Sequence, residues 1–216
     1  MILKFNPEMA AYADVKQYGF LGLSYLGWVG FMTLWVLQAV VFWSGMNSIR
    51  KFIDWAGPAV YVVMFAMAAW LVTQVGWENI DLNLGGVKYE GLDILPVMIG
   101  AIALVVSYFS GPVLNFGDFS RYGKSFEAVK FGNFLGLPVN FLGFSLLTVV
   151  CIAATLPIYG KLITDPVEMV GKLDNTFVVI LGSLTLMIAT VGINIVANFV
   201  SPAFDFSNVS LNKISW

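Results

Sequence analysis

The 216-residue sequence contains no histidine, one cysteine and few charged side chains. Without histidine or a second cysteine, the chain cannot form a His/Cys zinc site, a Ser-His-Asp triad, a redox CxxC pair or an internal disulfide. Its 11 basic and 13 acidic residues give a net charge of −2, which leaves no polybasic surface for nucleic acid. Charged residues make up 11% of the chain, against about 25% in soluble domains. The composition therefore excludes an ordinary soluble enzyme.

Hydrophobic residues make up 59% of the chain and gather in five long stretches without Asp, Glu, Lys or Arg. Each stretch is longer than the roughly 20 residues with which a helix crosses about 30 Å of hydrocarbon. A helix also satisfies its own backbone hydrogen bonds in lipid, whereas barrel strands would be shorter and would alternate in polarity. The sequence predicts an all-α polytopic membrane protein with a single transmembrane region over 1–216. The expected spans are approximately 18–47, 55–77, 94–117, 130–157 and 175–201.

An odd number of spans places the two ends of the chain on opposite sides of the membrane. Six of the eleven Lys and Arg residues, including Arg50 and Arg121, fall on the side that holds the C-terminus. Because basic residues favour the cytoplasmic side, we expect the N-terminus outside and the C-terminus inside. The expected location is a bacterial-type inner (plasma) membrane.

A polar stripe marks the fifth span. Its members are spaced by four, four, three and four residues, which places them on one face of a helix: Thr190, Asn194, Asn198, Ser201 and Asp205. Carboxamides are unfavourable in lipid, so this face is expected to meet other helices or an aqueous cavity. The stripe can stabilise contacts between helices through hydrogen bonds, each of which contributes about 0.6–2 kcal/mol to helix association. It can equally clamp a planar, uncharged ligand that carries amide groups, since each carboxamide has two donor hydrogens and one acceptor oxygen.

The third span carries a Gly111-Pro112 pair well inside its hydrophobic run. Proline removes a backbone donor and clashes with the preceding turn, so the pair predicts a helix break. Transporters place interrupted helices at their substrate sites, although an ordinary proline kink fits the pair as well. Tyr108 and Phe109 lie just before the pair, where their rings could stack on a flat heterocycle or simply pack.

Three motifs give the chain a family resemblance. They are IRKFIDWAGP (Ile49–Pro58), NFGDFSRYGKS (Asn115–Ser125) and ATVGINIVANFVSPAFDFSN (Ala189–Asn208). In this order and spacing they resemble the nucleobase:cation symporter family, the permeases for cytosine, purines, uracil, thiamine, allantoin and hydantoins. The resemblance implies a five-plus-five inverted-repeat transporter fold, of which this chain is similar to the fourth to eighth helices. The remaining helices of the full-length transporter would then be its partners.

The resemblance also implies a substrate site. Phe109, with Tyr108 beside it, matches the aromatic position that stacks on the substrate in the sixth helix of the family. Asn198 matches an eighth-helix asparagine that hydrogen-bonds the amide edge of the substrate, and Asn194 lies one turn earlier.

The implied ion site departs from the sodium-coupled pattern. Those members carry Ser and Thr hydroxyls where this sequence has Gly192 and Ile193, so that Gly192 and Ala189 offer only backbone carbonyls. Sodium requires several oxygen ligands, which weakens the case for it. Asp118 and Asp205, at the inner ends of the spans, are the candidate carriers for coupling to H⁺. We favour H⁺ over Na⁺ and expect no other cofactor and no metal site.

The sequence thus predicts a secondary active, cation-coupled importer of a nucleobase or related planar heterocycle of the cytosine, uracil, purine, allantoin or hydantoin class. Transport would proceed by alternating access, with membrane lipid and a small-molecule substrate as partners and without nucleic acid. The absence of histidine and of carboxylates within the spans argues against an enzyme and against any catalytic residue. Two alternatives remain, a channel or pore-type membrane subunit and a structural helix module of a membrane complex.

Overall fold

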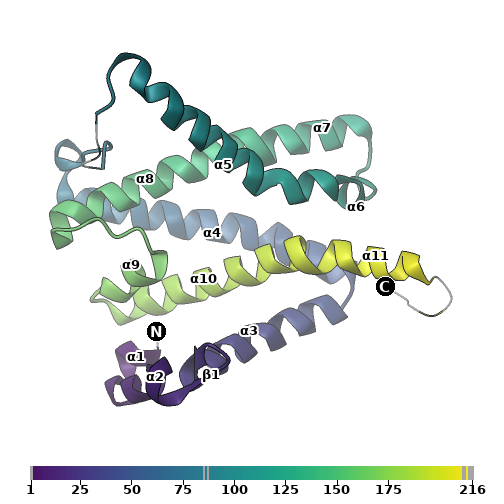
Figure 1. Cartoon of the computed structure of the whole chain (residues 1–216), viewed down its shortest axis with the longest axis horizontal. Helices are drawn as coiled ribbons and strands as arrows, with labels where there is room; N and C mark the ends of the chain where they lie inside the picture. Colours follow the sequence, from purple (N-terminus) through teal and green to yellow (C-terminus); the bar gives the residue numbers. More distant parts are fainter. Residues whose placement is uncertain (1, 85, 87, 211–212, 214–216) are drawn as a thin grey trace. The chain divides into compact units, whose positions relative to one another are not determined.

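The computed structural model describes residues 2–84, 86, 88–210 and 213. Helices dominate these residues (Figure 1). Contacts divide the chain into two compact units. Unit 1 comprises Met1–Ala69 and Ile163–Ile195, and unit 2 comprises Trp70–Leu162 and Val196–Trp216.

Unit 1 opens with short elements and continues with long helices. In chain order these are α1 (Ile2–Phe5), the 3₁₀ helix η1 (Pro7–Ala13), α2 (Val15–Tyr18), β1 (Gly19–Phe20), β2 (Leu23–Ser24), α3 (Tyr25–Trp43), most of α4 (Met46–Val75), α9 (Pro166–Lys172) and α10 (Thr176–Ile195).

Unit 2 follows from the last turns of α4. It contains the 3₁₀ helices η2 (Trp77–Asn79) and η3 (Gly91–Asp93), then α5 (Ile94–Leu114), α6 (Phe116–Ser120), α7 (Phe126–Phe134), the π-helix η4 (Leu135–Val139), α8 (Asn140–Tyr159), the π-helix η5 (Val196–Val200) and α11 (Ser201–Val209).

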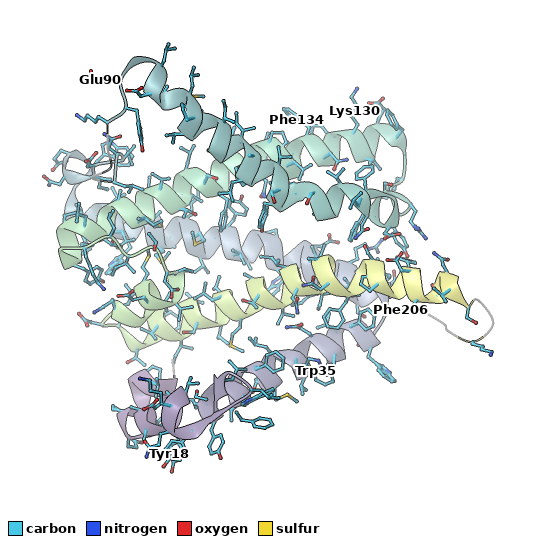
Figure 2. The ribbon with its side chains drawn as sticks, viewed as in Figure 1. Tyr18, Trp35, Glu90, Lys130, Phe134 and Phe206 are labelled. Atoms are coloured by element: carbon cyan, nitrogen blue, oxygen red, sulfur yellow. The ribbon has the colours of Figure 1, made fainter. Side chains whose placement is uncertain are left out.

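Five helical stretches within the described residues are long and apolar enough to cross a membrane. They are Tyr25–Trp43, Met46–Val75, Gly91–Leu114, Phe126–Tyr159 and Thr176–Val209. Large apolar side chains cover their outer surfaces, and the labelled Trp35, Phe134 and Phe206 each have half or more of their area exposed (Figure 2). Exposed apolar surface on this scale suits lipid or further helices rather than water. The chain is built as an integral membrane protein.

The first long helix begins at Tyr25, later than the expected start at residue 18. The intervening residues form a tight antiparallel hairpin that pairs Gly19 with Ser24. Leu21 and Gly22 at its tip have φ values of 48° and 84°, the left-handed conformation that two-residue hairpin turns require. The Ser24 side chain then caps α3 by accepting a hydrogen bond from the Gly27 N–H at 3.1 Å. A hairpin followed by a cap sets this helix start.

The second long helix begins earlier than expected. The expected span starts at residue 55, yet α4 already begins at Met46, after Gly45 turns the chain with a φ of 80°. The basic segment Arg50–Lys51 therefore lies in the first turns of α4 rather than in a loop, and the helix continues through Pro58.

Among the described residues of unit 2, two helical turns are π-helical, and each is near a proline. Pro138 lies within η4, and Pro202 follows η5 by two residues. Proline has no N–H to donate to the carbonyl four residues earlier, and a π turn relieves this by pairing residues five apart. In η4 the N–H of Asn140 accordingly donates to the carbonyl of Leu135.

The connection between the fourth and fifth long helical stretches contains α9, which takes part in a core cluster of unit 1. Asp165 caps α9 by accepting from the Val167 N–H at 2.8 Å, and Asn175 caps α10 by accepting from the Phe177 N–H at 2.9 Å. Between these caps, apolar side chains of α9 pack on α10 in a cluster of Val170, Leu173, Val179 and Leu186. Two capped helices thus form a compact corner (Figure 1).

Candidate functional site

The predicted site residues fall in both units. Unit 1 holds Ala189, Gly192 and Asn194, and unit 2 holds Tyr108, Phe109, Gly111, Pro112, Asp118, Asn198 and Asp205.

In unit 1, Asn194 is hydrogen-bonded to a residue that the sequence did not single out. Its Nδ2 donates to Oε1 of Gln38, which lies on α3, 156 residues away in the chain. Gln38 is only 5% exposed and is the one buried residue of α3, a helix whose other side chains are mostly exposed and apolar. A lone carboxamide in an otherwise apolar span is the sequence signal that could have identified Gln38.

Gly192, one of the two candidate ion residues of α10, lies near α4. A Cβ built on Gly192 would lie 3.5 Å from Cε1 of Phe52, so the Phe52 ring packs beside this glycine. Thr190 lies beside Ala189 on the same helix, and its hydroxyl donates a hydrogen bond to the Leu186 carbonyl of that helix at 2.8 Å. Across the described part of the chain, no group of three or more His, Cys, Asp or Glu side chains could hold a metal ion.

In unit 2, the expected helix break at Gly111 and Pro112 is not found at that pair. Helix α5 continues through both residues to Leu114, and the Asn115 N–H still donates to the Gly111 carbonyl at 3.2 Å. Membrane helices tolerate an internal proline when nearby groups compensate for the lost backbone bond. The interruption lies instead at Asn115, whose φ of −97° and ψ of 14° separate α5 from the short helix α6.

The two aromatic candidates belong to one ring cluster. Tyr108 and Phe109 meet edge to face with centroids 5.1 Å apart, and Phe109 meets Phe141 of α8 at 5.6 Å, also edge to face. These are favourable geometries for aromatic pairs. Tyr108 is 69% exposed, whereas Phe109 is half-buried. Phe141 was not predicted, and it holds the Phe109 ring in place.

Asn198 lies inside the π turn η5 and is exposed. The prediction of one polar face assumed regular α-helical spacing, which the π turn interrupts between Val196 and Val200. After this turn, Ser201 is buried while Asp205 is exposed, so these two residues of the predicted polar face differ in their surroundings. The proline at 202 is the sequence signal for the interruption.

Asp118 pairs with a cation rather than standing alone. Its Oδ1 lies 2.9 Å from Nη2 of Arg121, three residues later. The Arg121 guanidinium also lies 4.4 Å from the ring centroid of Phe204 on α11, and Tyr122 contacts the same ring at 6.4 Å. Within unit 2, these groups connect the end of α6 to α11.

The sequence is similar to a family of known proteins. The family described as permease for cytosine/purines, uracil, thiamine, allantoin matches residues 2–216. An allantoin permease of Bacillus subtilis (strain 168) is 30% identical over 89% of this chain and 39% of its own length. A purine-uracil permease of Arabidopsis thaliana is 29% identical over 88% of this chain and 31% of its own length. A putative allantoin permease of Escherichia coli (strain K12) is 26% identical over 91% of this chain and 40% of its own length.

No solved structure matches the chain. The chain spans less than half the length of the curated relatives named above. Five membrane-length helices and a family match along nearly the whole sequence lead to one assignment: the chain belongs to the permease family for cytosine/purines, uracil, thiamine and allantoin.

Proposed function

We propose that the chain is the middle section of a secondary active importer of a nucleobase or a related planar nitrogen heterocycle. The observation that carries this proposal is the presence of two carboxamides, Asn194 and Asn198, within the long apolar helical stretch Thr176–Val209 of a permease-family chain. Two carboxamides can bind the amide edge of a neutral base without burying a charge. The names of the relatives, which refer to allantoin and to purine and uracil, support a substrate of this chemical class.

The aromatic cluster supports the same class of substrate. Phe109 is fixed edge to face by Phe141, and Tyr108 beside it is exposed. A flat heterocycle stacked on such a ring gains dispersion energy without needing a particular hydrogen-bonding pattern. Tyr108 and Phe109 therefore serve as the stacking surface, and Asn198 serves as the hydrogen-bonding group.

The coupling ion is H⁺ rather than Na⁺ in this proposal. Ala189 and Gly192 contribute only carbonyl oxygens, and the nearby Thr190 hydroxyl bonds to its own helix. Asp118 is paired with Arg121, so protonation of Asp118 would weaken the connection between α6 and α11, while Asp205 is exposed. Either carboxylate can carry the proton.

The test is uptake by a complete transporter that contains this sequence, in cells lacking their own base permeases. We expect saturable uptake of radiolabelled allantoin, uracil, cytosine, hypoxanthine or hydantoin, abolished by a protonophore and unchanged when Na⁺ is replaced by choline. Uptake of none of these compounds would overturn the proposed substrate class. Flux that rises linearly with concentration would favour the channel alternative, and dependence on Na⁺ would overturn H⁺ coupling.

The proposed location is the plasma membrane, with the beginning of this chain outside and its end inside. The chain's one cysteine, Cys151, is buried, which gives a low background for thiol labelling. A Glu90→Cys variant should react with an impermeant maleimide in intact cells, whereas Lys124→Cys should react only after permeabilisation. The reverse pattern would overturn this orientation.

A further inference from the structure

Gln38 is an unusual residue for its position. It lies within α3, it is almost completely buried, and its Oε1 accepts the hydrogen bond from Asn194. The other polar side chain in the middle of α3, Thr33, is exposed and donates to the Val29 carbonyl of its own helix at 2.7 Å. Gln38 therefore directs its polar group to another helix, whereas Thr33 does not.

The hydrogen bond fixes the orientation of the Asn194 carboxamide. An asparagine side chain carries a donor amino group and an acceptor oxygen, and a half turn exchanges their places. Because Nδ2 donates to Gln38, the amino group of Asn194 faces α3. Asn194 is half-buried, so part of its side chain remains accessible while Gln38 holds it.

Helix contact alone is a weak explanation for this pair. Hydrogen bonds between membrane helices contribute on average only about 0.6 kcal/mol. Helices α3 and α10 already pack together within unit 1, and apolar side chains could fill the same space. A buried glutamine aimed at a candidate substrate residue fits a role in setting the hydrogen-bonding pattern that a ligand meets.

We infer that Gln38 is a positioning residue of the substrate site: it does not touch the substrate, but it orients the Asn194 carboxamide that does. This inference rests on the proposed function and extends it to a residue on a different helix. In this inference, a residue of α3 affects the affinity for substrate although it does not contact the substrate.

The test measures initial uptake rates in the complete transporter for wild type, Gln38→Met, Gln38→Glu, Asn194→Ala and the double variant Gln38→Met/Asn194→Ala. Methionine keeps the length of glutamine but removes its acceptor oxygen, whereas glutamic acid keeps an acceptor. We expect Gln38→Met to raise the apparent KM about five- to tenfold, as for the loss of one buried hydrogen bond. The maximal rate per transporter should change little, and Gln38→Glu should stay closer to the wild-type KM.

The double variant separates positioning from an independent effect. If Gln38 acts through Asn194, the double variant should have the same KM as Asn194→Ala alone. The matched control is Thr33→Val on the same helix, which should keep the wild-type KM because its hydroxyl bonds within α3.

Several outcomes would overturn the inference. An unchanged KM in Gln38→Met, with or without a lower melting temperature, would make the pair a helix contact only. Multiplying effects in the double variant would make the two residues independent. If Gln38→Met does not reach the membrane, Gln38→Asn takes its place in the test. Its shorter side chain should give a KM between those of wild type and Asn194→Ala. A wild-type KM for Gln38→Asn would refute the positioning role. Wild-type transporter that takes up no base is a separate result and refutes the proposed function itself.

Discussion

The guanidinium of Arg121 lies 4.4 Å from the ring centroid of Phe204 and, at the same time, 2.9 Å from the carboxylate of Asp118. Arg121 follows α6 directly and Phe204 lies on α11, so one side chain connects two helices of unit 2. Asp118 is the less exposed partner, with 15% of its side chain accessible. The planar guanidinium can hydrogen-bond a carboxylate and stack on an aromatic ring at the same time. The compact ammonium group of lysine cannot make both interactions in this arrangement.

Replacement of Arg121 by glutamine should lower stability modestly. The variant loses both the ion pair and the ring contact, each expected to contribute about 1 kcal/mol or less because Arg121 is half exposed. Thermal unfolding in detergent would measure the change, with Lys124→Gln, an exposed cation nearby, as the control. Phe204→Leu should cost less than Arg121→Gln, and a larger cost for Phe204→Leu would show that the ring acts mainly through other contacts.

Asn198→Ala should raise the apparent KM for the transported base severalfold. Its carboxamide is exposed within the π turn, where it is proposed to bind the amide edge of the substrate. Initial uptake rates over a range of substrate concentrations would measure the effect, with the exposed Asn208→Ala on α11 as the matched control. Unchanged uptake of every candidate base would remove Asn198 from the site.

Phe109→Leu should also raise KM, by about two- to tenfold, because leucine retains the apolar volume but loses the stacking face. Phe109→Tyr should retain most of the affinity. Phe126→Leu, at a highly exposed ring outside the aromatic cluster, is the control for a general loss of aromatic area. Competition by unlabelled base against labelled substrate gives the affinity of each variant, and equal values for Phe109→Leu and wild type would refute stacking at this ring.

Gly182→Ala should destabilise the packing of α9 on α10. A Cβ at Gly182 would lie 3.0 Å and 3.1 Å from the two methyl groups of Val170, which is buried and stiff at χ1. The overpacked contact should cost about 1 kcal/mol or more. Gly100→Ala is the matched control on α5, where a Cβ meets no atom within 4 Å and the better helix propensity of alanine should stabilise. Melting temperatures that rise for both variants would contradict this account.

The sequence was sufficient to predict the helical membrane architecture and the family. Long runs without charge leave helices as the main solution in lipid, and that argument needs no knowledge of packing. The exact starts of the helices depended on local turns instead. The first long helix begins at Tyr25 because Leu21 and Gly22 form a hairpin turn, and a run of apolar residues carries no sign of that turn.

The details of the site depended on tertiary contacts that periodicity does not reveal. The pairing of Gln38 with Asn194 joins residues far apart in the sequence, so neither segment predicts it alone. The expected break at Gly111-Pro112 and the regular spacing of the polar stripe both depended on backbone geometry that the sequence pattern does not fix. Helix α5 passes through Pro112 and ends two residues later, and Pro202 is preceded by a π turn that the four-residue spacing did not anticipate.

The π turn at Val196–Val200 has a consequence for how this helix tolerates change in length. A π turn commonly accommodates one residue more than the regular helix around it. Removal of a single residue there should convert the turn to ordinary α-helix, whereas the same deletion in the middle of α10 would shift an entire packed face. A chain that gains or loses one residue at this point would therefore change which side chains occupy each position of the turn while keeping the rest of the helix.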